Sequence, residues 1–360
     1  MGKTRFFTGS YTRPEGHVPG GCGAGILSCL LDEKSGEMSI GTVRTGLLNP
    51  SWVLPSPDGR YLYALEENPD EPGSVVAFQI EEDGSLVETD RRRAAGRASC
   101  HLTCTADGRE LFCASYLDGF LTWFRMEEGR FLSADSVSYR GNGPNRERQE
   151  GAHPHQAAVH PDGGFLAVCD LGSDRIRLHG LPFSRENPVR SAALPAGYGP
   201  RHLVFDPAGG LFHVLCELKP RLLTFRIPEE DGMMPRLLED QPVLPAQYLY
   251  GSDGVVPSPA ALRMHPSGKA LYLSVRGCNR ISVFCPDGEG IPRWKTDFPS
   301  LGVTPRDIAF SPSGRWLLAA GQDSDAIVPF SVDEVTGLPA GDPGPVLGCG
   351  SPSCIAFAAP

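Results

Sequence analysis

Residues 199–218 read GPRHLVFDPAGGLFHVLCEL, and this stretch decides the fold of the whole chain. Apolar-rich runs lie on both sides of Pro207-Ala208-Gly209-Gly210, a pattern that predicts two antiparallel strands joined by a tight turn. Arg201 precedes Gly209 by eight residues, and Glu217 follows it by eight. In a hairpin centred on Gly209 these two side chains lie opposite one another, far from the turn. They form either part of a ligand site or one structural ion pair, and this stretch alone leaves both open.

The same hairpin pattern recurs along the chain at a period typical of repeat folds. Its turn glycines are spaced by 49, 55, 46, 59 and 46 residues. Each hairpin is followed by a third apolar run, such as GSVVAFQI, GFLTWFRM, RLLTFRI or RISVFC. The six turn glycines are Gly59, Gly108, Gly163, Gly209, Gly268 and Gly314. These repeats predict six units of about four strands each.

A seventh unit is divided between the two ends of the sequence. Residues 351–360, SPSCIAFAAP, repeat the first half of the sixth hairpin, and residues 5–11, RFFTGSY, supply a second strand. Seven four-stranded units whose ends pair with each other predict an all-β fold, a seven-bladed β-propeller. We expect residues 1–360 to form this single domain. Pairing of the two ends also removes an open sheet edge.

Composition narrows the classes of function. The chain has 360 residues, 40% of them hydrophobic and 21% charged, which is enough apolar material for a core. A net charge of −10 argues against nucleic-acid binding. No segment resembles a signal peptide or a membrane span, so we expect no membrane partner and a cytoplasmic protein. Eleven cysteines without a C-x-x-C pair predict reduced thiols. We expect neither a metal site nor a cofactor.

The propeller geometry gathers polar residues at one mouth of the central channel. The first strand of each blade lines the channel, so residues eight before and eight after each turn glycine should meet at the same end. Charged groups in a narrow channel are usually paired or contact a ligand. The predicted pairs are Ser51 with Glu67, Cys100 with Tyr116, His155 with Leu171, Arg201 with Glu217, Ala260 with Arg276, Arg306 with Gln322, and Ser353 with Ser10.

Other polar residues have structural interpretations beside the functional ones. His153 and His155 flank Pro154 at the start of an inner strand, and no third ligand nearby supports zinc. His160 and His265 precede the turns and should lie on the opposite face as structural residues. Two connections, residues 138–152 and 241–259, are long enough to carry function.

Six stretches are distinctive: GPNRERQEGAHPHQ (143–156), CDLGSD (169–174), GPRH (199–202), CEL (216–218), SVRG (274–277) and TPRD (304–307). They resemble the seven-bladed propeller lactonases, which include the propeller type of 6-phosphogluconolactonase and the carboxy-muconate lactonising enzyme. The resemblance covers nearly the whole chain and implies that His155, Arg201, Glu217 and Arg276 are the functional residues. Cys216, Val275 and Cys278 stand where the family usually has asparagine, asparagine and histidine, which leaves the substrate open.

The resemblance implies hydrolysis of a sugar lactone, most closely 6-phosphogluconolactone, without metal or covalent intermediate. His155 is the expected general base, because an adjacent arginine keeps Glu217 ionised and weakly basic. Glu217 either orients Arg201 or helps to position the water. The arginines suit an anionic substrate. The expected substrate contacts are His153, Arg148, Gln149, Arg306 and Glu67.

Two other functions remain open at this point. A lactonising cycloisomerase would use the same arginines for carboxylates, with a proton donor in place of the water base. A non-catalytic propeller would present its rim as a binding platform, which a charged mouth argues against. The expected partner is a small anionic sugar lactone, and the expected assembly is a monomer or a weak homo-oligomer.

Overall fold

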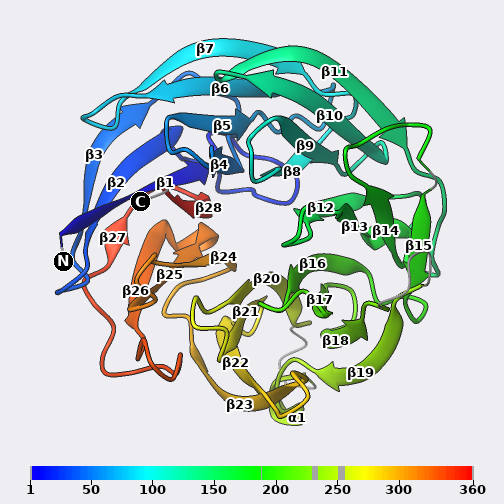
Figure 1. Ribbon diagram of the computed structural model, residues 1–360. Helices are drawn as coiled ribbons and strands as arrows, with labels where there is room; N and C mark the ends of the chain where they lie inside the picture. The colour runs from blue at the N-terminus through cyan, green and yellow to red at the C-terminus, as the bar shows by residue number, and fades with distance from the viewer. Residues whose placement is uncertain (1, 188, 229–233, 250–255, 359–360) are drawn as a thin grey trace.

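The protein is a ring of seven β-sheets around a central channel (Figure 1). A computed structural model describes residues 2–187, 189–228, 234–249 and 256–358. Within these ranges every named strand belongs to one of seven four-stranded antiparallel sheets. The prediction of a seven-bladed β-propeller is therefore confirmed. Within the same ranges, no helix has both the length and the apolar character needed to cross a membrane.

Blade 1 combines the two ends of the chain, and blades 2 to 7 each use four consecutive strands. Blade 1 contains β28 (Pro352–Phe357), β1 (Lys3–Ser10), β2 (Ile26–Asp32) and β3 (Met38–Arg44). Blade 2 contains β4 (Val53–Pro55), β5 (Tyr61–Leu65), β6 (Ser74–Ile80) and β7 (Leu86–Arg93). Blade 3 contains β8 (Ser99–Cys104), β9 (Glu110–Ser115), β10 (Phe120–Glu127) and β11 (Arg130–Ser138). Blade 4 contains β12 (Pro154–Val159), β13 (Phe165–Asp170), β14 (Arg175–Gly180) and β15 (Arg190–Ala193).

The remaining blades follow the same order from the channel outward. Blade 5 contains β16 (Pro200–Phe205), β17 (Leu211–Cys216), β18 (Arg221–Arg226) and β19 (Arg236–Pro242). Blade 6 contains β20 (Ser258–Met264), β21 (Leu271–Arg276), β22 (Arg280–Pro286) and β23 (Pro292–Pro299). Blade 7 contains β24 (Pro305–Phe310), β25 (Trp316–Gly321), β26 (Ala326–Ser331) and β27 (Leu347–Gly348). The described helices are short: α1 (Ala246–Leu249) and two 3₁₀ turns, Leu171–Ser173 and Gln322–Ser324.

The core lies between adjacent blades. Middle strands are buried on both faces, as in LFHVLC of β17, because each sheet packs against two neighbours. Blades 4 and 5, for example, share one cluster in which Phe212 stacks on Phe225 with ring centroids 5.0 Å apart. The outermost strands are mostly exposed, as in the charged β7. This layering keeps the inner strands rigid, so the side chains at the channel mouth are held in fixed positions.

The ring is closed by the two ends of the chain, as the sequence predicts. Phe7 of β1 pairs with Ala356 of β28, and Thr8 pairs with Ile355. Figure 1 shows the blue and red strands of blade 1 side by side. Phe6 and Phe7 are fully buried in the clusters on either side of this blade. The closing sheet is therefore as well packed as the others.

Most inner strands begin with a β-bulge, so the residues eight before and eight after the turn glycine are not directly paired as the sequence predicts. In blade 5 the register shifts between Pro200 and His202, so Arg201 has no partner in the ladder. Pro200 pairs with Cys216, and Glu217 follows the end of β17. The same shift leaves Cys100, His155 and Arg306 unpaired in blades 3, 4 and 7. An extra residue re-aims a side chain, so the bulges turn these residues toward the channel.

The opposite ends of the hairpins carry contacts between blades. His160 Nε2 lies 2.8 Å from the carbonyl oxygen of Gly209 in the next blade, and His265 Nε2 lies 3.0 Å from that of Gly314. Both histidines are buried and hold the turn of the following blade. Their predicted place on the turn face, with a structural role, is confirmed. All eleven cysteines are free thiols, as expected.

Candidate active site

A buried carboxylate with three arginines forms the centre of the channel mouth. Glu217 Oε2 lies 2.9 Å from Nε of Arg201, and Oε1 lies 2.9 Å from Nη2 of Arg148 and 3.2 Å from Nη2 of Arg276. Arg201 belongs to the bulge of β16, whereas Arg276 ends β21 and Arg148 comes from the connection 138–152. Three segments therefore meet on one carboxylate.

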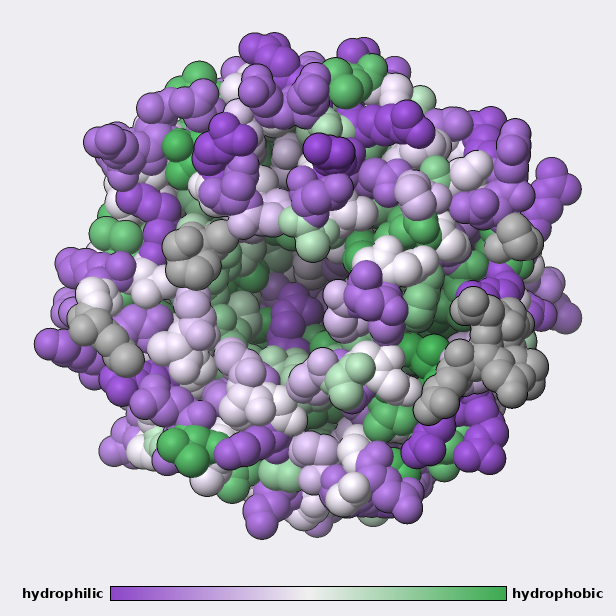
Figure 2. All heavy atoms as spheres, in the orientation of Figure 1, coloured by the Kyte–Doolittle hydropathy of each residue, from purple (hydrophilic) through white to green (hydrophobic). Residues whose placement is uncertain are grey.

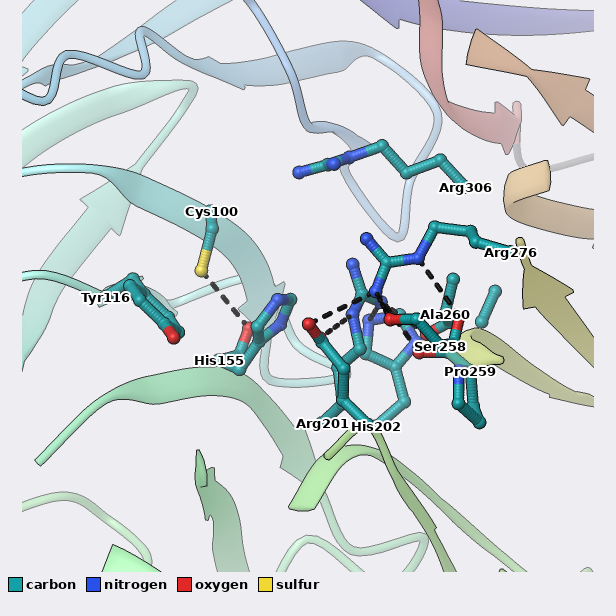
Figure 3. Close-up of polar contacts among 12 residues, drawn as sticks. Cys100, Tyr116, His155, Arg201, His202, Ser258, Pro259, Ala260, Arg276 and Arg306 are labelled. Carbon is teal, nitrogen blue, oxygen red and sulfur yellow. Dashed lines mark hydrogen bonds and ion pairs between the residues drawn. The ribbon is translucent and has the colours of Figure 1, made fainter. Parts of the chain in front are cut away.

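The backbone and neighbouring side chains fix two of these guanidinium groups. Arg201 Nη1 donates to the carbonyl oxygen of Ala260 and lies 3.1 Å from Nε2 of His202. Arg276 donates from Nε to the carbonyl oxygen of Ser258 at 3.2 Å and from Nη2 to its hydroxyl at 2.7 Å (Figure 3). Donors fixed in this way need little reorganisation to bind an anion.

The electrostatics of the cluster follow from burial and like charge. Burial alone would raise the pKa of Glu217, but Arg276, Arg201 and Arg148 outweigh it and hold the pKa well below its usual value. Burial and the nearby Arg276 lower the pKa of Arg201 to about 9. All of these groups therefore stay charged at neutral pH. Glu217 is consequently a poor proton acceptor.

A small cavity lies beside this cluster and collects the channel-facing residues of several blades. Its volume is about 10 Å³, close to the space that one water molecule needs. Figure 3 shows His155 and Cys100 on one side of the site, with Arg306 and Arg276 extending from the other. A ligand larger than a water molecule has to bind above this cavity, in the open mouth. The lining consists of Ser51, Trp52, Glu67, Cys100, His155, Arg201, His202, Arg306 and Ser353.

His155 is the titratable base that the geometry leaves available. Its side chain is 9% exposed, and its buried Nδ1 has no hydrogen-bond partner among the described residues. Burial, followed by the positive charge of Arg201, lowers the pKa of His155 well below its usual value. His155 is therefore neutral at pH 7, with a free ring nitrogen. Its ring packs edge-on against Tyr116, with centroids 5.9 Å apart.

A second polar cluster lies on the side of the mouth formed by blades 1, 2 and 7. The Tyr11 hydroxyl accepts a hydrogen bond from Arg306 Nη2 at 2.6 Å and donates to Glu67 Oε2 at 2.9 Å. Arg306 Nη1 also donates to Gln322 Oε1 at 3.2 Å, which brings together a pair expected from the sequence. His17 Nε2 lies 3.2 Å from the same hydroxyl. Arg306, Glu67 and His17, from three different segments, thus converge on one buried tyrosine.

Tyr11 and His17 are residues that the sequence reasoning missed. Tyr11 directly follows Ser10, which the hairpin geometry places at the mouth. The same geometry could therefore have predicted the position of Tyr11. His17 lies in the connection 11–25, between β1 and β2. The contacts of Arg13 with Glu15 and of Glu15 with Asn49 fix the course of this connection. The sequence signal that could have identified His17 is a titratable side chain in the connection that follows Ser10 at the mouth.

Two expected substrate contacts are positioned by the protein itself. Gln149 is fully buried, and its amide nitrogen donates to the carbonyl oxygen of Leu171 at 2.9 Å while its amide oxygen accepts from Asn145 N. His153 is 2% exposed, stacks on Tyr116 and lies 2.8 Å from the tyrosine's carbonyl oxygen through Nδ1. These contacts anchor the connection 138–152, and a substrate contact for either residue stays a prediction.

Aromatic rings lie one residue deeper in the channel. Trp52, His101 and His202 each follow a residue predicted at the mouth, and their rings contact one another. Burial and nearby arginines lower the pKa of both histidines well below the usual value, so they are neutral. Arg263, held by Asp307 at 2.8 Å, covers the face of Trp52. Figure 2 shows one face of the molecule hollowed at the centre of the ring, with hydrophilic residues deep in the hollow.

Two other kinds of site are less well supported by the structure. The described residues contain no group of three or more His, Cys, Asp or Glu side chains suited to hold a metal ion. A groove of about 980 Å³ runs between blades 2 and 3 near their turns and is lined by residues such as Asp58, Arg60, Asp107 and Glu127. Its charges are of mixed sign and none of the site residues above lines it, so the smaller cavity remains the candidate.

Comparisons with known proteins agree with the fold. Over 343 residues the chain is 29% identical to a 6-phosphogluconolactonase of Formosa agariphila, covering 92% of this chain and 93% of the relative. It is 26% identical over 335 residues to the 6-phosphogluconolactonase of Bacillus subtilis, with 92% of each chain covered. A relative in Lactococcus lactis, 29% identical over 344 residues, is an uncharacterized protein.

Solved structures show the same architecture over the whole chain. The periplasmic gluconolactonase of Pseudomonas aeruginosa superposes with a TM-score of 0.88 at 26% identity, covering 99% of each chain. Because that relative is periplasmic, the cytoplasmic location expected from the sequence stays a prediction. Residues 5–357 match the family described as "Lactonase, 7-bladed beta-propeller". The chain therefore belongs to the seven-bladed β-propeller lactonase family.

Proposed function

We propose that this protein hydrolyses an anionic sugar lactone, 6-phosphogluconolactone in the first instance, with side chains as the only catalysts. The observation that carries the proposal is the arrangement around Glu217, where three arginines gather at the mouth beside the neutral His155. The names of the relatives from Formosa agariphila and Bacillus subtilis support the choice of substrate.

His155 is the general base in this proposal. It is neutral at pH 7 and lines the cavity, so it can take a proton from a water held there as the water attacks the lactone carbonyl. Its low pKa limits its strength as a base but keeps it in the active form over a wide range of pH. Glu217 is the weaker candidate because both of its oxygens already face guanidinium groups.

The arginines bind the anion and stabilise the oxyanion. Arg201 is almost fully buried and is fixed by Glu217 and Ala260, so it can face the negative charge that develops on the carbonyl oxygen. Arg276 and the more exposed Arg148 lie nearer the opening, where a phosphate or carboxylate would enter. Glu217 acts in this arrangement as the counter-ion that keeps the three guanidinium groups together.

A coupled assay tests the proposal. The substrate is generated in place by oxidation of glucose 6-phosphate, and its disappearance is compared with the spontaneous rate. We expect acceleration by the purified protein and loss of that acceleration in His155→Ala. Glucono-1,5-lactone, which lacks the phosphate, tests the activity named for the Pseudomonas aeruginosa relative. Conversion of a carboxy-muconate in place of either lactone would instead favour the cycloisomerase, and no activity with any of the three would overturn the proposal.

A further inference from the structure

A second buried carboxylate, that of Glu67, faces the same cavity as His155. Glu67 is 5% exposed and follows the end of β5 in blade 2, whereas His155 belongs to blade 4. The cavity is small enough that both side chains border the space of about one water molecule. Ring opening needs a base for the water and an acid for the leaving ring oxygen, and the role proposed above for His155 is that of the base.

The surroundings of Glu67 differ from those of Glu217 in one decisive respect. Three arginine side chains contact Glu217, but within the described ranges no Lys or Arg side chain makes an ion pair with Glu67. Its Oε2 atom instead accepts hydrogen bonds from the hydroxyls of Ser51 and Tyr11. Because Oε2 has two donors, Oε1 remains to carry a proton.

We propose that Glu67 is a catalytic residue that acts, in its protonated form, as the general acid for the leaving ring oxygen. The inference rests on the proposed lactone hydrolysis and completes it with a named proton donor. Two carboxylates of one site in different environments can take different roles, one ionised and one protonated. Glu217, held by arginines, is the ionised member of this pair, and Glu67 is the protonated member.

The proton balance of the reaction closes with these groups. A water oxygen attacks the carbonyl carbon, and its proton goes to His155. The bond between the carbonyl carbon and the ring oxygen then breaks, and the ring oxygen takes the proton of Glu67 to become a hydroxyl group. The product carboxylic acid loses one proton to solvent. The proton on protonated His155 restores Glu67 through water, so the enzyme returns to its starting state.

A hydrogen-bonded path can also exchange the Glu67 proton with solvent. Tyr11 bonds to Glu67 on one side and lies 3.2 Å from His17 Nε2 on the other, and the His17 side chain is 50% exposed. His17 Nε2 also lies 3.6 Å from Oε1 of Glu67. The Glu67 carboxyl group therefore borders the cavity, and Tyr11 and His17 connect it to solvent at the mouth.

Several groups set the charge state of Glu67. Burial raises its pKa, whereas Arg306 and the hydroxyls of Ser51 and Tyr11 oppose the rise and Glu15 adds to it. The charged and titratable groups that face Glu67 are Tyr11, Glu15, His17, Cys100, His155, Arg201 and Arg306. Because the net effect on the pKa is upward, the acid form persists to higher pH than for an ordinary glutamate.

The test compares Glu67→Gln with Glu66→Gln as a matched control. Glu66 is the preceding residue, but its carboxylate contacts Arg91 and the backbone of Leu48, and it does not line the cavity. General-acid help is worth about 10²–10⁴-fold, so we expect Glu67→Gln to lower kcat by at least about 10²-fold with little change in KM. Glu66→Gln should keep the wild-type kcat.

The pH profile separates this role from a structural one. In the wild type, kcat should fall on the alkaline side as Glu67 ionises, and the fall should be absent in Glu67→Gln. Ser51→Ala removes a hydrogen bond that favours the ionised form, so it should move the alkaline fall to higher pH without abolishing activity. A folded Glu67→Gln variant with wild-type kcat, or an alkaline fall that Ser51→Ala leaves in place, would overturn the inference. Wild-type hydrolysis of the lactone in the same experiment shows that the proposed function itself stands.

Discussion

The Nε atom of Arg201 lies 2.9 Å from Oε2 of Glu217, and both side chains are almost entirely buried at the mouth of the channel. The pair is not isolated, because the second oxygen of Glu217 faces Arg148 and Arg276. The three guanidinium groups around Glu217 therefore carry more positive charge than one carboxylate can balance. The uncompensated part of that charge is what an anionic substrate would meet.

Replacing Glu217 by glutamine should destabilise the fold. The change leaves buried guanidinium groups without their counter-ion, which typically costs about 3–5 kcal/mol. Urea unfolding should show this loss, while Glu334→Gln, which breaks the surface pair with Arg315, should change stability by less than about 1 kcal/mol. Equal unfolding midpoints for both variants would contradict the role assigned to Glu217.

The stabilising effect of Glu217 should depend on pH. Its pKa in the folded protein is held well below the ordinary value of 4.5, so the unfolded state binds the proton more tightly. The contribution to stability is therefore complete above about pH 4.5 and is lost as the pH falls below it, through the folded pKa. The difference in free energy of unfolding between wild type and Glu217→Gln should narrow in acid, and a constant difference would argue against the depressed pKa.

His155→Ala removes the proposed general base and Arg276→Ala removes a proposed anion contact, and each change should lower kcat/KM by at least about tenfold. Both side chains lie at the mouth, so the fold should survive. His213→Gln is a suitable control, because His213 is buried in β17, bonds to Thr224 and does not line the cavity. Steady-state kinetics on folded variants checks this, and full activity of both alanine variants would refute the site.

The acid side of the pH profile should report His155. Burial and Arg201 hold the pKa of His155 well below the usual 6.5, so the neutral, active form persists into acid. We expect kcat/KM to stay nearly constant as the pH falls through 6.5 and to decline only at lower values. A decline centred on pH 6.5 would mean that another group is the base.

Arg148→Gln should weaken binding of charged lactones more than of neutral ones. Arg148 is 43% exposed and is the most accessible arginine on Glu217. A charge-assisted hydrogen bond of about 1.5 kcal/mol corresponds to a rise in KM of about tenfold. Arg97→Gln, a change in an equally exposed arginine paired with Asp118, should leave KM unchanged. An equal rise for glucono-1,5-lactone would contradict an anion contact.

The repeated hairpins made the architecture predictable from the sequence. The apolar runs on both sides of each glycine turn predict the strands and their order. The half-unit at each end of the chain predicts that the two ends pair and close the ring. The location of the site followed from the same geometry. Arg201, Glu217 and Arg276 do meet at one mouth, and His155 lines the adjoining cavity.

The details that escaped prediction depend on contacts between segments distant in sequence. The bulge that leaves Arg201 unpaired in the β-ladder has no recognisable pattern in the local sequence. Tyr11 acquires its role only because Glu67, Arg306 and His17 approach it from three other segments. The hydrogen bonds of the Gln149 amide to the backbone of Asn145 and Leu171 were not expected, and its contact with a substrate stays a prediction. Such pairings are set by the assembled ring.

The closure of the ring has a consequence for how the chain can assemble. Gly9 and Cys354 pair across blade 1, so the two partners are 345 residues apart (354 − 9). Loop-closure entropy grows only with the logarithm of length, and bringing these ends together costs about 2 kcal/mol more than closing a loop the size of one blade. Burial of a single large side chain such as Phe7, worth about 1.5–3 kcal/mol, offsets that difference. Joining the most distant parts of the chain is therefore thermodynamically no harder than forming any other blade, and blade 1 can be the last to assemble without being the weakest.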